Sequence, residues 1–386
     1  MMLKEPFHLP IYVKIAFLLI SGYGVTFLFY IGQDIFIPVM FSALFAVLLN
    51  PAVKYLIHHG LHRMIAIALV ILVTSLLICG LIYFMWTQLS MFTERIPELK
   101  TKLATVLEDG STWLSSRSGV DKKQIDEYIT KTKDEFTAGS GSFIGNTLST
   151  ITGTLVLIIL IPIYVFMMLY YEPLFTEFTK RVFPKEKHGA VGEIVAESKS
   201  AMQHYLGGLL VETGIIAVMN SVGLLVIGVE YAILWGILGG LLNIIPYIGG
   251  AVAVALPMLM ALLTQDQSAV IMVLVLYTVV QFIDNNFIVP AVVASRVKIN
   301  ALVSVVVVLI GGALWGVPGM FLSIPVIGVV KIIFDRITPL KPYGYLLGDI
   351  VPEEDDSFFS LADIRKKFRK KKEGIAQIVK EDIVQE

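Results

Sequence analysis

Two carboxylates lie inside otherwise apolar stretches of the sequence, and they are its first candidates for chemistry. Glu212 stands in the apolar run that begins at Leu206, and Asp284 stands near the end of the run that begins at Ala269. A carboxylate at the centre of a bilayer helix costs roughly 2.5–3.5 kcal/mol on insertion scales, so such a residue commonly serves a proton, a cation or a substrate. We therefore expect Glu212 and Asp284 to couple ion binding to pH-dependent transport.

Amide side chains flank Asp284 in the sequence. Gln281, Asn285 and Asn286 are its neighbours, and Pro290 follows within two helical turns. Proline removes a backbone donor and interrupts a helix, which frees backbone carbonyls close to these side chains. Carboxylate, amide and carbonyl oxygens together suit a small cation or a polyhydroxylated solute. The alternative is that the amides cap a helix end at the membrane surface, where water satisfies them.

A second candidate site is the segment 243–250, which interrupts an apolar stretch. It contains Asn243, Pro246, Tyr247, Gly249 and Gly250. The paired glycines allow close backbone approach, and the asparagine offers both a donor and an acceptor. A simple turn would need only the proline and the glycines, so the asparagine is the residue that indicates binding.

The sequence carries no recognisable enzymatic pattern. Gly-x-x-x-x-Gly-Lys-Ser/Thr, His-Glu-x-x-His and Gly-x-Ser-x-Gly are all absent. His58 and His62 have a spacing that could hold a metal on a helix, but no carboxylate or cysteine stands near them, so we interpret them as loop residues. The single cysteine, Cys79, cannot form an intrachain disulfide. We expect no enzyme, no cofactor and no metal site.

The composition explains where these polar residues must lie. The chain has 386 residues, of which 56% are hydrophobic and only 16% charged, and its mean hydropathy is +0.78. A soluble domain is about a quarter charged, and its surface must be largely polar. Most of this protein is therefore solvated by lipid, and the net charge of −1 indicates no nucleic-acid partner. The predicted fold class is an all-α polytopic membrane protein.

About eight membrane elements follow from the apolar runs. Six of them have the roughly 20 residues that a bilayer crossing needs, at 13–32, 35–51, 64–86, 148–171, 206–229 and 269–290. Two others are interrupted, 232–263 at the point described above and 301–334 at Trp315–Gly319, which contains Gly316, Pro318 and Gly319. Each arm of about 15 residues would measure roughly 22 Å, which is short for a crossing. We expect two re-entrant helical hairpins.

Lysine and arginine residues in the short loops predict that both termini of this multi-pass protein are cytoplasmic. In that orientation the fifth span and the first hairpin are followed by the sixth span and the second hairpin with the opposite membrane orientation. This arrangement is the inverted repeat of many secondary transporters. The predicted regions are a three-span region, an extracytoplasmic helical insert, a fourth span with a cytoplasmic connector, a transport core and a charged cytoplasmic tail, at 1–86, 87–147, 148–205, 206–334 and 335–386.

Two regions outside the membrane keep alternative interpretations. The insert contains a short helical seam, which would be an oligomer contact, a movable gate or an amphipathic helix on the membrane. The tail contains a basic run at 365–372 that would bind anionic lipid or simply lie in water.

Several segments resemble the autoinducer-2 exporter family of bacterial membrane proteins over about residues 13–334. They are Asn243-Ile244-Ile245-Pro246-Tyr247-Ile248-Gly249, Gln281…Asn285…Pro290, Gly311-Gly312-Ala313-Leu314-Trp315-Gly316-Val317-Pro318-Gly319-Met320…Ile324-Pro325, Pro38, Asn50-Pro51, Gly60, Arg63-Met64-Ile65-Ala66 and Tyr205-Leu206-Gly207-Gly208. The resemblance implies a multi-pass protein of the bacterial inner membrane that forms a homo-oligomer, with a pentamer among the options, and moves by an elevator-like mechanism. Three departures from the family pattern are Ser295, Lys298-Ile299-Asn300-Ala301 and Glu212. The last of them favours a proton- or cation-linked variant.

Together these observations predict a secondary transporter that exports a small polar solute, with an autoinducer-2-like signal implied by the resemblance and an ion gradient as the driving force. A sodium(lithium)/proton antiporter is the alternative, since some relatives are described in that way. A membrane scaffold without transport and a channel remain as rivals from other classes. The expected partners are the solute, a monovalent cation or proton, and the lipid bilayer.

Overall fold

The computed structural model describes residues 10–94, 97–98, 101–102, 105, 159–245, 249–265, 267–293 and 299–349. Within these ranges the elements are helices, together with one isolated bridge between Ile299 and Gly348. Six of the helices are long and apolar enough to cross a membrane, or seven if the bent pair Ile159–Tyr170 and Glu172–Val182 is one span. The predicted all-α polytopic membrane fold is confirmed. Most of the predicted insert, the start of the fourth span and the tail beyond residue 349 lie outside the described residues.

Three long helices begin the chain: α1 (Ile11–Ile31), α2 (Gln33–His58) and α3 (Arg63–Glu94). The first buries none of its residues, whereas α2 and α3 pack with the helix Ile159–Tyr170 around a shared apolar cluster. The Arg63 guanidinium donates a hydrogen bond of 2.7 Å to the Leu169 carbonyl, which links the start of α3 to the end of the helix Ile159–Tyr170.

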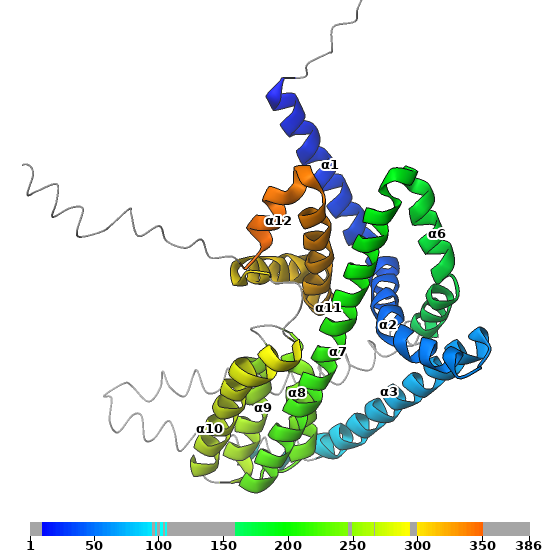
Figure 1. Ribbon diagram of the computed structural model, residues 1–386. Coiled ribbons are helices and arrows are strands. Elements are labelled where there is room, and N and C mark those ends of the chain that lie inside the picture. Colours follow the sequence, from blue (N-terminus) through cyan, green and yellow to red (C-terminus); the bar gives the residue numbers. More distant parts are fainter. Residues whose placement is uncertain are drawn as a thin grey trace, which may run out of the picture. The chain divides into compact units, whose positions relative to one another are not determined.

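The longest helix of the structure, α7 (His188–Ile227), has 40 residues and passes beside α2, α8 and α11 (Figure 1). At 1.5 Å per residue it measures roughly 60 Å, about twice the thickness of a bilayer core. It therefore begins within the region predicted as a connector and continues without interruption through the fifth predicted span. The connector also contains α6 (Glu172–Val182) and the short helix η1 (Lys185–Lys187).

An ion pair between Lys199 and Glu172 joins α7 to the start of α6. Partial burial alone would raise the pKa of the Glu172 carboxyl, but hydrogen bonds from Lys199 and Asn50 outweigh it and hold that pKa below its usual range. The carboxylate therefore stays ionised at neutral pH and keeps its partner.

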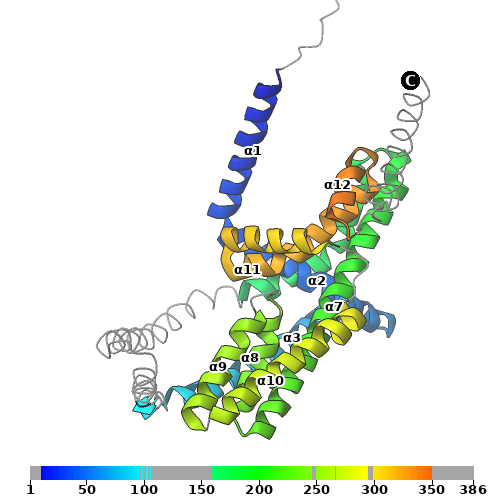
Figure 2. The same cartoon turned by 90° about the vertical axis from the view of Figure 1, so that its left-hand side faces the viewer.

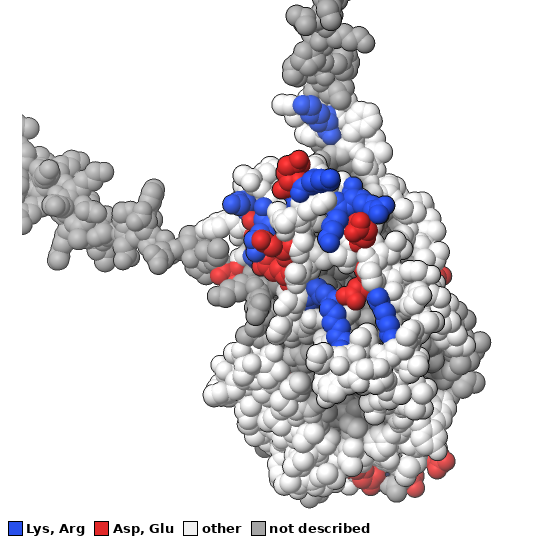
Figure 3. Space-filling view, turned by 45° about the vertical axis from the view of Figure 1, so that its right-hand side comes forward, with Lys and Arg blue, Asp and Glu red and all other residues white. Residues whose placement is uncertain are grey.

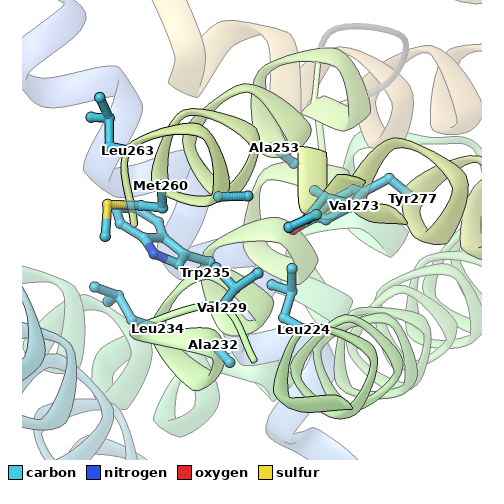
Figure 4. Close-up of a cluster of buried hydrophobic side chains, with 12 residues drawn as sticks. Leu224, Val229, Ala232, Leu234, Trp235, Ala253, Met260, Leu263, Val273 and Tyr277 are labelled. Atoms are coloured by element: carbon cyan, nitrogen blue, oxygen red, sulfur yellow. The ribbon is translucent and has the colours of Figure 1, made fainter. Parts of the chain in front are cut away.

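The first predicted hairpin is present as α8 (Ala232–Asn243) and α9 (Gly249–Thr264). It is followed by α10 (Gln267–Ile283) and by a π-helical segment, η2 (Asp284–Val293). Figure 2 shows α8, α9 and α10 side by side next to one end of α7. Buried side chains from all four helices, among them Leu224, Trp235, Met260 and Val273, form one apolar cluster (Figure 4). This group of helices is called the α7–α10 bundle below.

The second predicted hairpin lies within α11 (Ala301–Arg336), which folds back on itself. Trp315 and Gly316 have non-helical backbone angles, and the glycine has φ +63°, a conformation that other residues rarely adopt. The Ser323 hydroxyl donates to the Val307 carbonyl at 2.9 Å, 16 residues away, which shows that the two arms lie against each other. Two short helices, η3 (Thr338–Leu340) and α12 (Lys341–Leu347), complete the described chain.

Charged side chains are unevenly distributed over the face of the protein that Figure 3 shows. Figure 3 shows lysine, arginine, aspartate and glutamate gathered toward one end of the visible face, a broad surface without charges beyond them, and a few acidic groups at the opposite end. Large apolar side chains are exposed throughout the long helices, for example Leu77 at 71% and Val226 at 83%. Such a belt would be unfavourable in water and is typical of a surface that faces lipid.

Gly236→Ala should destabilise the contact between α7 and α8. An ideal Cβ at this position would lie 2.1 Å from Ser221 Oγ and 2.5 Å from the Ser221 backbone nitrogen, and overpacking of this kind costs about 1–3 kcal/mol. We expect a lower midpoint of thermal unfolding for the purified protein in detergent, followed by tryptophan fluorescence. Gly214→Ala is the matched control on α7, because nothing lies within 4 Å of its Cβ position. Equal midpoints for Gly236→Ala and the unmodified protein would contradict this packing.

Candidate transport site

A cavity of about 840 Å³ lies where α7, the first hairpin, α10, η2 and α11 meet. Its volume is within the range of small-molecule sites, roughly 300–1,000 Å³. Its walls combine apolar side chains with polar groups contributed by Tyr205, Glu212, Asn243, Tyr277, Thr278, Gln281, Asp284, Asn285 and Ser304. We call it the acidic cavity, because these groups include two carboxylates that pair with no lysine or arginine of the described ranges.

Helical periodicity directs most of these side chains into the acidic cavity. Tyr205, Leu209 and Glu212 are spaced by four and three residues on α7, so they share one face of that helix. Leu274, Thr278 and Gln281 repeat the pattern on α10. The two faces are turned toward each other because the helices pack side by side.

One amide bridges the two carboxylates. The Asn243 Nδ2 atom donates to Glu212 Oε1 at 3.1 Å and to Asp284 Oδ2 at 3.0 Å. Both carboxylates are buried, with 6% of Glu212 and 2% of Asp284 exposed. The amide has two N–H groups and so can satisfy one oxygen of each. The sequence predicted all three residues as candidates, and the structure brings them into direct contact although they lie on three different elements.

The charge of this carboxylate pair is not balanced by a basic side chain in the described ranges. The ion pairs found there involve other residues, such as Arg336 with Glu197 and Arg181 with Glu177. Asp284 Oδ1 also has no hydrogen-bond partner among the described residues. A buried acceptor without a donor is unfavourable, so this oxygen is suited to a proton or a small cation.

Gln281 and the first hairpin complete the polar wall. The Gln281 amide donates weakly to Asp284 Oδ2 at 3.4 Å and to Asn285 Oδ1 at 3.3 Å. An ideal Cβ on Gly250 would lie 2.7 Å from Gln281 Oε1, and one on Gly249 would lie 1.8 Å from the Leu242 carbonyl oxygen. The predicted close approach at the paired glycines is therefore present. Pro246 and Tyr247 lie outside the described residues.

The helix around Asp284 widens instead of breaking. The sequence predicts an interruption between Gln281 and Pro290, but the chain continues from α10 into the π-helical η2, which begins at Asp284 itself. A π-helix bonds to the fifth residue along the chain, and such turns are frequent at functional sites. Pro290 lies within η2, where it can donate no backbone hydrogen bond. Asp284, the first residue of η2, is buried and lines the acidic cavity.

Other predicted residues lie away from the acidic cavity. Asn286 is exposed and donates to the Phe282 carbonyl at 2.8 Å, and Pro290 is exposed as well. Gly316, Pro318 and Gly319 form the turn of α11, where the neighbouring Trp315 indole donates to the Phe29 carbonyl of α1 at 2.9 Å. None of these five residues lines the acidic cavity.

Four polar residues of the acidic cavity are absent from the sequence-based candidates: Tyr205, Tyr277, Thr278 and Ser304. A signal for three of them exists in the spacing, because Tyr205 precedes Glu212 by seven residues, while Tyr277 and Thr278 precede Gln281 by four and three. Ser304 lies on α11 and reaches the cavity only through the packing of that helix, so no local pattern could indicate it.

Comparison with known proteins identifies the family. The model of the AI-2E family transporters matches residues 15–338. The AI-2 transport protein TqsA of Escherichia coli (strain K12) is 23% identical over 350 residues, which are 89% of this chain and 97% of that protein. YueF of Bacillus subtilis (strain 168), provisionally named a transport protein, is 23% identical and covers 88% of this chain and 95% of its own length. Because the match spans most of the chain, and because the helices enclose a polar cavity, this protein belongs to the AI-2E family of membrane transporters.

Proposed function

We propose that this protein is a secondary transporter in which a proton or a monovalent cation binds at Glu212, Asn243 and Asp284 while a small polar solute occupies the acidic cavity. The observation that carries the proposal is the single amide shared by two buried carboxylates. In this arrangement the two carboxylates are close together, Asn243 bridges them, and Gln281 adds one long hydrogen bond to Asp284.

The carboxylate pair has two states of different total charge, one with both groups ionised and one with a bound proton or monovalent cation. When both carboxylates are ionised, the repulsion between them and their desolvation oppose the buried position. One proton or one monovalent cation on the unpaired Asp284 Oδ1 removes part of this cost. A site that is stable only when occupied can couple ion binding to movement of the surrounding helices, because occupancy then decides which arrangement is favoured.

The remaining surface of the acidic cavity suits a small solute with several hydroxyl groups. Gln281 and Asn285 supply amide donors and acceptors, Thr278 and Ser304 supply hydroxyl groups, and apolar side chains fill the space between them. The relative TqsA is named for AI-2 transport. We therefore propose export of an autoinducer-2-like solute driven by an ion gradient.

Sodium(lithium)/proton antiport is the second candidate, and the same carboxylate pair favours it. A cation and a proton would then compete for Asp284, and no organic solute would be needed. We further propose that both termini are cytoplasmic, since Lys54, Arg63 and Arg336 all lie near helix ends that this orientation places on the cytoplasmic side.

Purified protein in sealed proteoliposomes with an internal pH dye separates these functions. A saturable pH change on addition of sodium or lithium alone would identify an antiporter, whereas a change that requires an autoinducer-2-like solute would identify coupled solute transport. If neither appears, uptake of the labelled solute would identify uncoupled transport. Its absence, with an intact protein, would leave the scaffold role and would contradict the proposal.

Asp284→Asn should abolish the ion-dependent pH change, because the amide cannot take up a proton at this position. Glu212→Gln should reduce the change and weaken its pH dependence, since it removes one of the two charges that Asn243 bridges. The measurement is the initial rate of the dye signal at several external pH values. Asp335→Asn is the control, because Asp335 pairs with Lys331 on α11 and does not line the acidic cavity. Full activity of Asp284→Asn would remove Asp284 from the mechanism.

Asn243→Ala should reduce ion-coupled transport by about tenfold or more, since it removes two charge-assisted hydrogen bonds, each stronger than a neutral one. Asn286→Ala should have little effect, because the Asn286 amide bonds to its own helix backbone and is exposed. The rate in proteoliposomes, normalised to protein that is incorporated and folded, is compared for the two variants. Equal loss in both would indicate that the amides support the helix and not the carboxylate pair.

A further inference from the structure

A second pocket lies where the loop between α2 and α3 meets the bend between the helix Ile159–Tyr170 and α6. Its volume is about 420 Å³, which is within the range of small-molecule sites. It shares no lining residue with the acidic cavity. Arg63 is the one lysine or arginine among the described residues that line it, and none of them is an aspartate or a glutamate. We call this space the Arg63 pocket.

The Arg63 guanidinium has hydrogen-bond donors that its protein contacts leave unused. It donates from Nη2 to the Leu169 carbonyl at 2.7 Å, which takes one of its five N–H groups. The ion pairs of the described ranges join other residues, so no carboxylate there neutralises its charge. Glu172, which is close to the pocket in sequence, pairs with Lys199 instead. A guanidinium in this state is suited to the oxygens of a phosphate group, which it can bind through parallel hydrogen bonds.

The side chains around Arg63 add further donors. His62, Tyr170 and Tyr171 line the same pocket, and imidazole and phenol groups can each donate a hydrogen bond. The two tyrosine rings lie edge to face with their centroids 5.1 Å apart, and both side chains are partly exposed. The pocket therefore combines one positive charge with three other donors, which favours an anionic ligand.

The positions of two apolar helices place the pocket at the level of a membrane surface. The candidate span Arg63–Phe92 begins with Arg63 itself, and the apolar helix Ile159–Tyr170 ends at Tyr170. Tyrosine is enriched where membrane helices meet water, because its ring is apolar and its hydroxyl is polar. A ligand of the Arg63 pocket would therefore lie among lipid headgroups.

Helix α6 turns along the same surface. It is bent by 59° from the helix Ile159–Tyr170, and one of its faces carries apolar side chains that are each more than half exposed, at Leu174, Phe175, Phe178 and Val182. An amphipathic helix of this kind is typical of helices that lie in the membrane interface. Leu174 belongs both to this face and to the lining of the Arg63 pocket. Apolar surface thus continues from the pocket onto α6.

We propose that the Arg63 pocket binds the phosphate of an anionic phospholipid, while the acyl chains of that lipid lie against the exposed apolar side chains of α3 and α6. A lipid is favoured over free phosphate because two exposed apolar residues, Met64 and Leu174, line the pocket together with the guanidinium. An anionic lipid is favoured over a zwitterionic one because the described lining offers no carboxylate to pair with an ammonium group. The site does not depend on which solute the protein transports.

Photocross-linking of the full chain in lipid vesicles tests this site. The vesicles consist of phosphatidylcholine with a minor fraction of a phosphatidylglycerol analogue that carries a photoreactive group next to the glycerol, and mass spectrometry locates the cross-linked residues. Label on Met64 is expressed relative to label on Leu77, which is exposed farther along α3 and reports contact with bulk lipid. We expect an excess of ordinary phosphatidylglycerol to lower this ratio, whereas inorganic phosphate and additional phosphatidylcholine should leave it unchanged.

Arg63→Gln should lower the relative Met64 label about tenfold or more, because it removes the charge and the charge-assisted hydrogen bonds to the phosphate. Arg181→Gln is the matched control and should keep the label, since Arg181 pairs with Glu177 on α6 and does not line the pocket. The midpoint of thermal unfolding shows that each variant is folded.

Leu174→Glu provides a second variant, which leaves Arg63 and its bond to the Leu169 carbonyl in place. Its carboxylate would repel the phosphate and pair with the guanidinium, so the relative Met64 label should fall here as well. Because 60% of Leu174 is exposed, the change removes little packing. Phe178→Glu is its matched control and should keep most of the label, since Phe178 is 63% exposed on the same face of α6 but does not line the pocket.

Three results would overturn the proposal. Equal relative labelling of Met64 by photoreactive phosphatidylcholine and phosphatidylglycerol would show no preference for an anionic lipid. Displacement by inorganic phosphate as effective as that by phosphatidylglycerol would identify a site for free phosphate. Equal label in folded Leu174→Glu and folded Phe178→Glu would place the lipid outside the Arg63 pocket.

Discussion

The structure depends on the burial of two carboxylates around a single amide in surroundings that offer no basic side chain within the described residues. Glu212, Asn243 and Asp284 come from α7, α8 and η2, so their contact requires three elements to meet at one point. An uncompensated carboxylate is unfavourable in a low-dielectric interior. Where α8 contacts α7, Gly236 and Gly240 leave no room for a Cβ atom, so these two helices pack closely.

Two different irregularities of the helices serve this contact. The first hairpin ends α8 at Asn243 and starts α9 at Gly249, which places the amide at a helix end where it is free to bridge two partners. The π-helical turn from Asp284 to Val293 keeps the second chain segment continuous but changes its pitch. Regular α-helices in both places would satisfy their own backbone groups and would leave fewer polar groups for a ligand.

Much of the candidate site could be predicted from the sequence, because a polar residue within an apolar run is conspicuous. Glu212, Asn243 and Asp284 were identified in this way. Asn286 has the same local appearance, yet its side chain bonds to its own helix. Tyr277 shows the opposite case, because an aromatic residue in an apolar run gives no sign of whether its hydroxyl faces lipid or a core. Neither distinction can be made without the direction in which each side chain points.

Composition and the lengths of the apolar runs are enough to predict a helical membrane protein in which two apolar stretches are interrupted. Which polar residues share a cavity depends instead on how the helices pack. Residues 212, 243 and 284 are separated by 31 and 41 positions. Their contact arises from the packing of separate helices, and no local sequence pattern indicates it. The same packing places the turn of α11 beside α1, where the Trp315 indole donates to the Phe29 carbonyl.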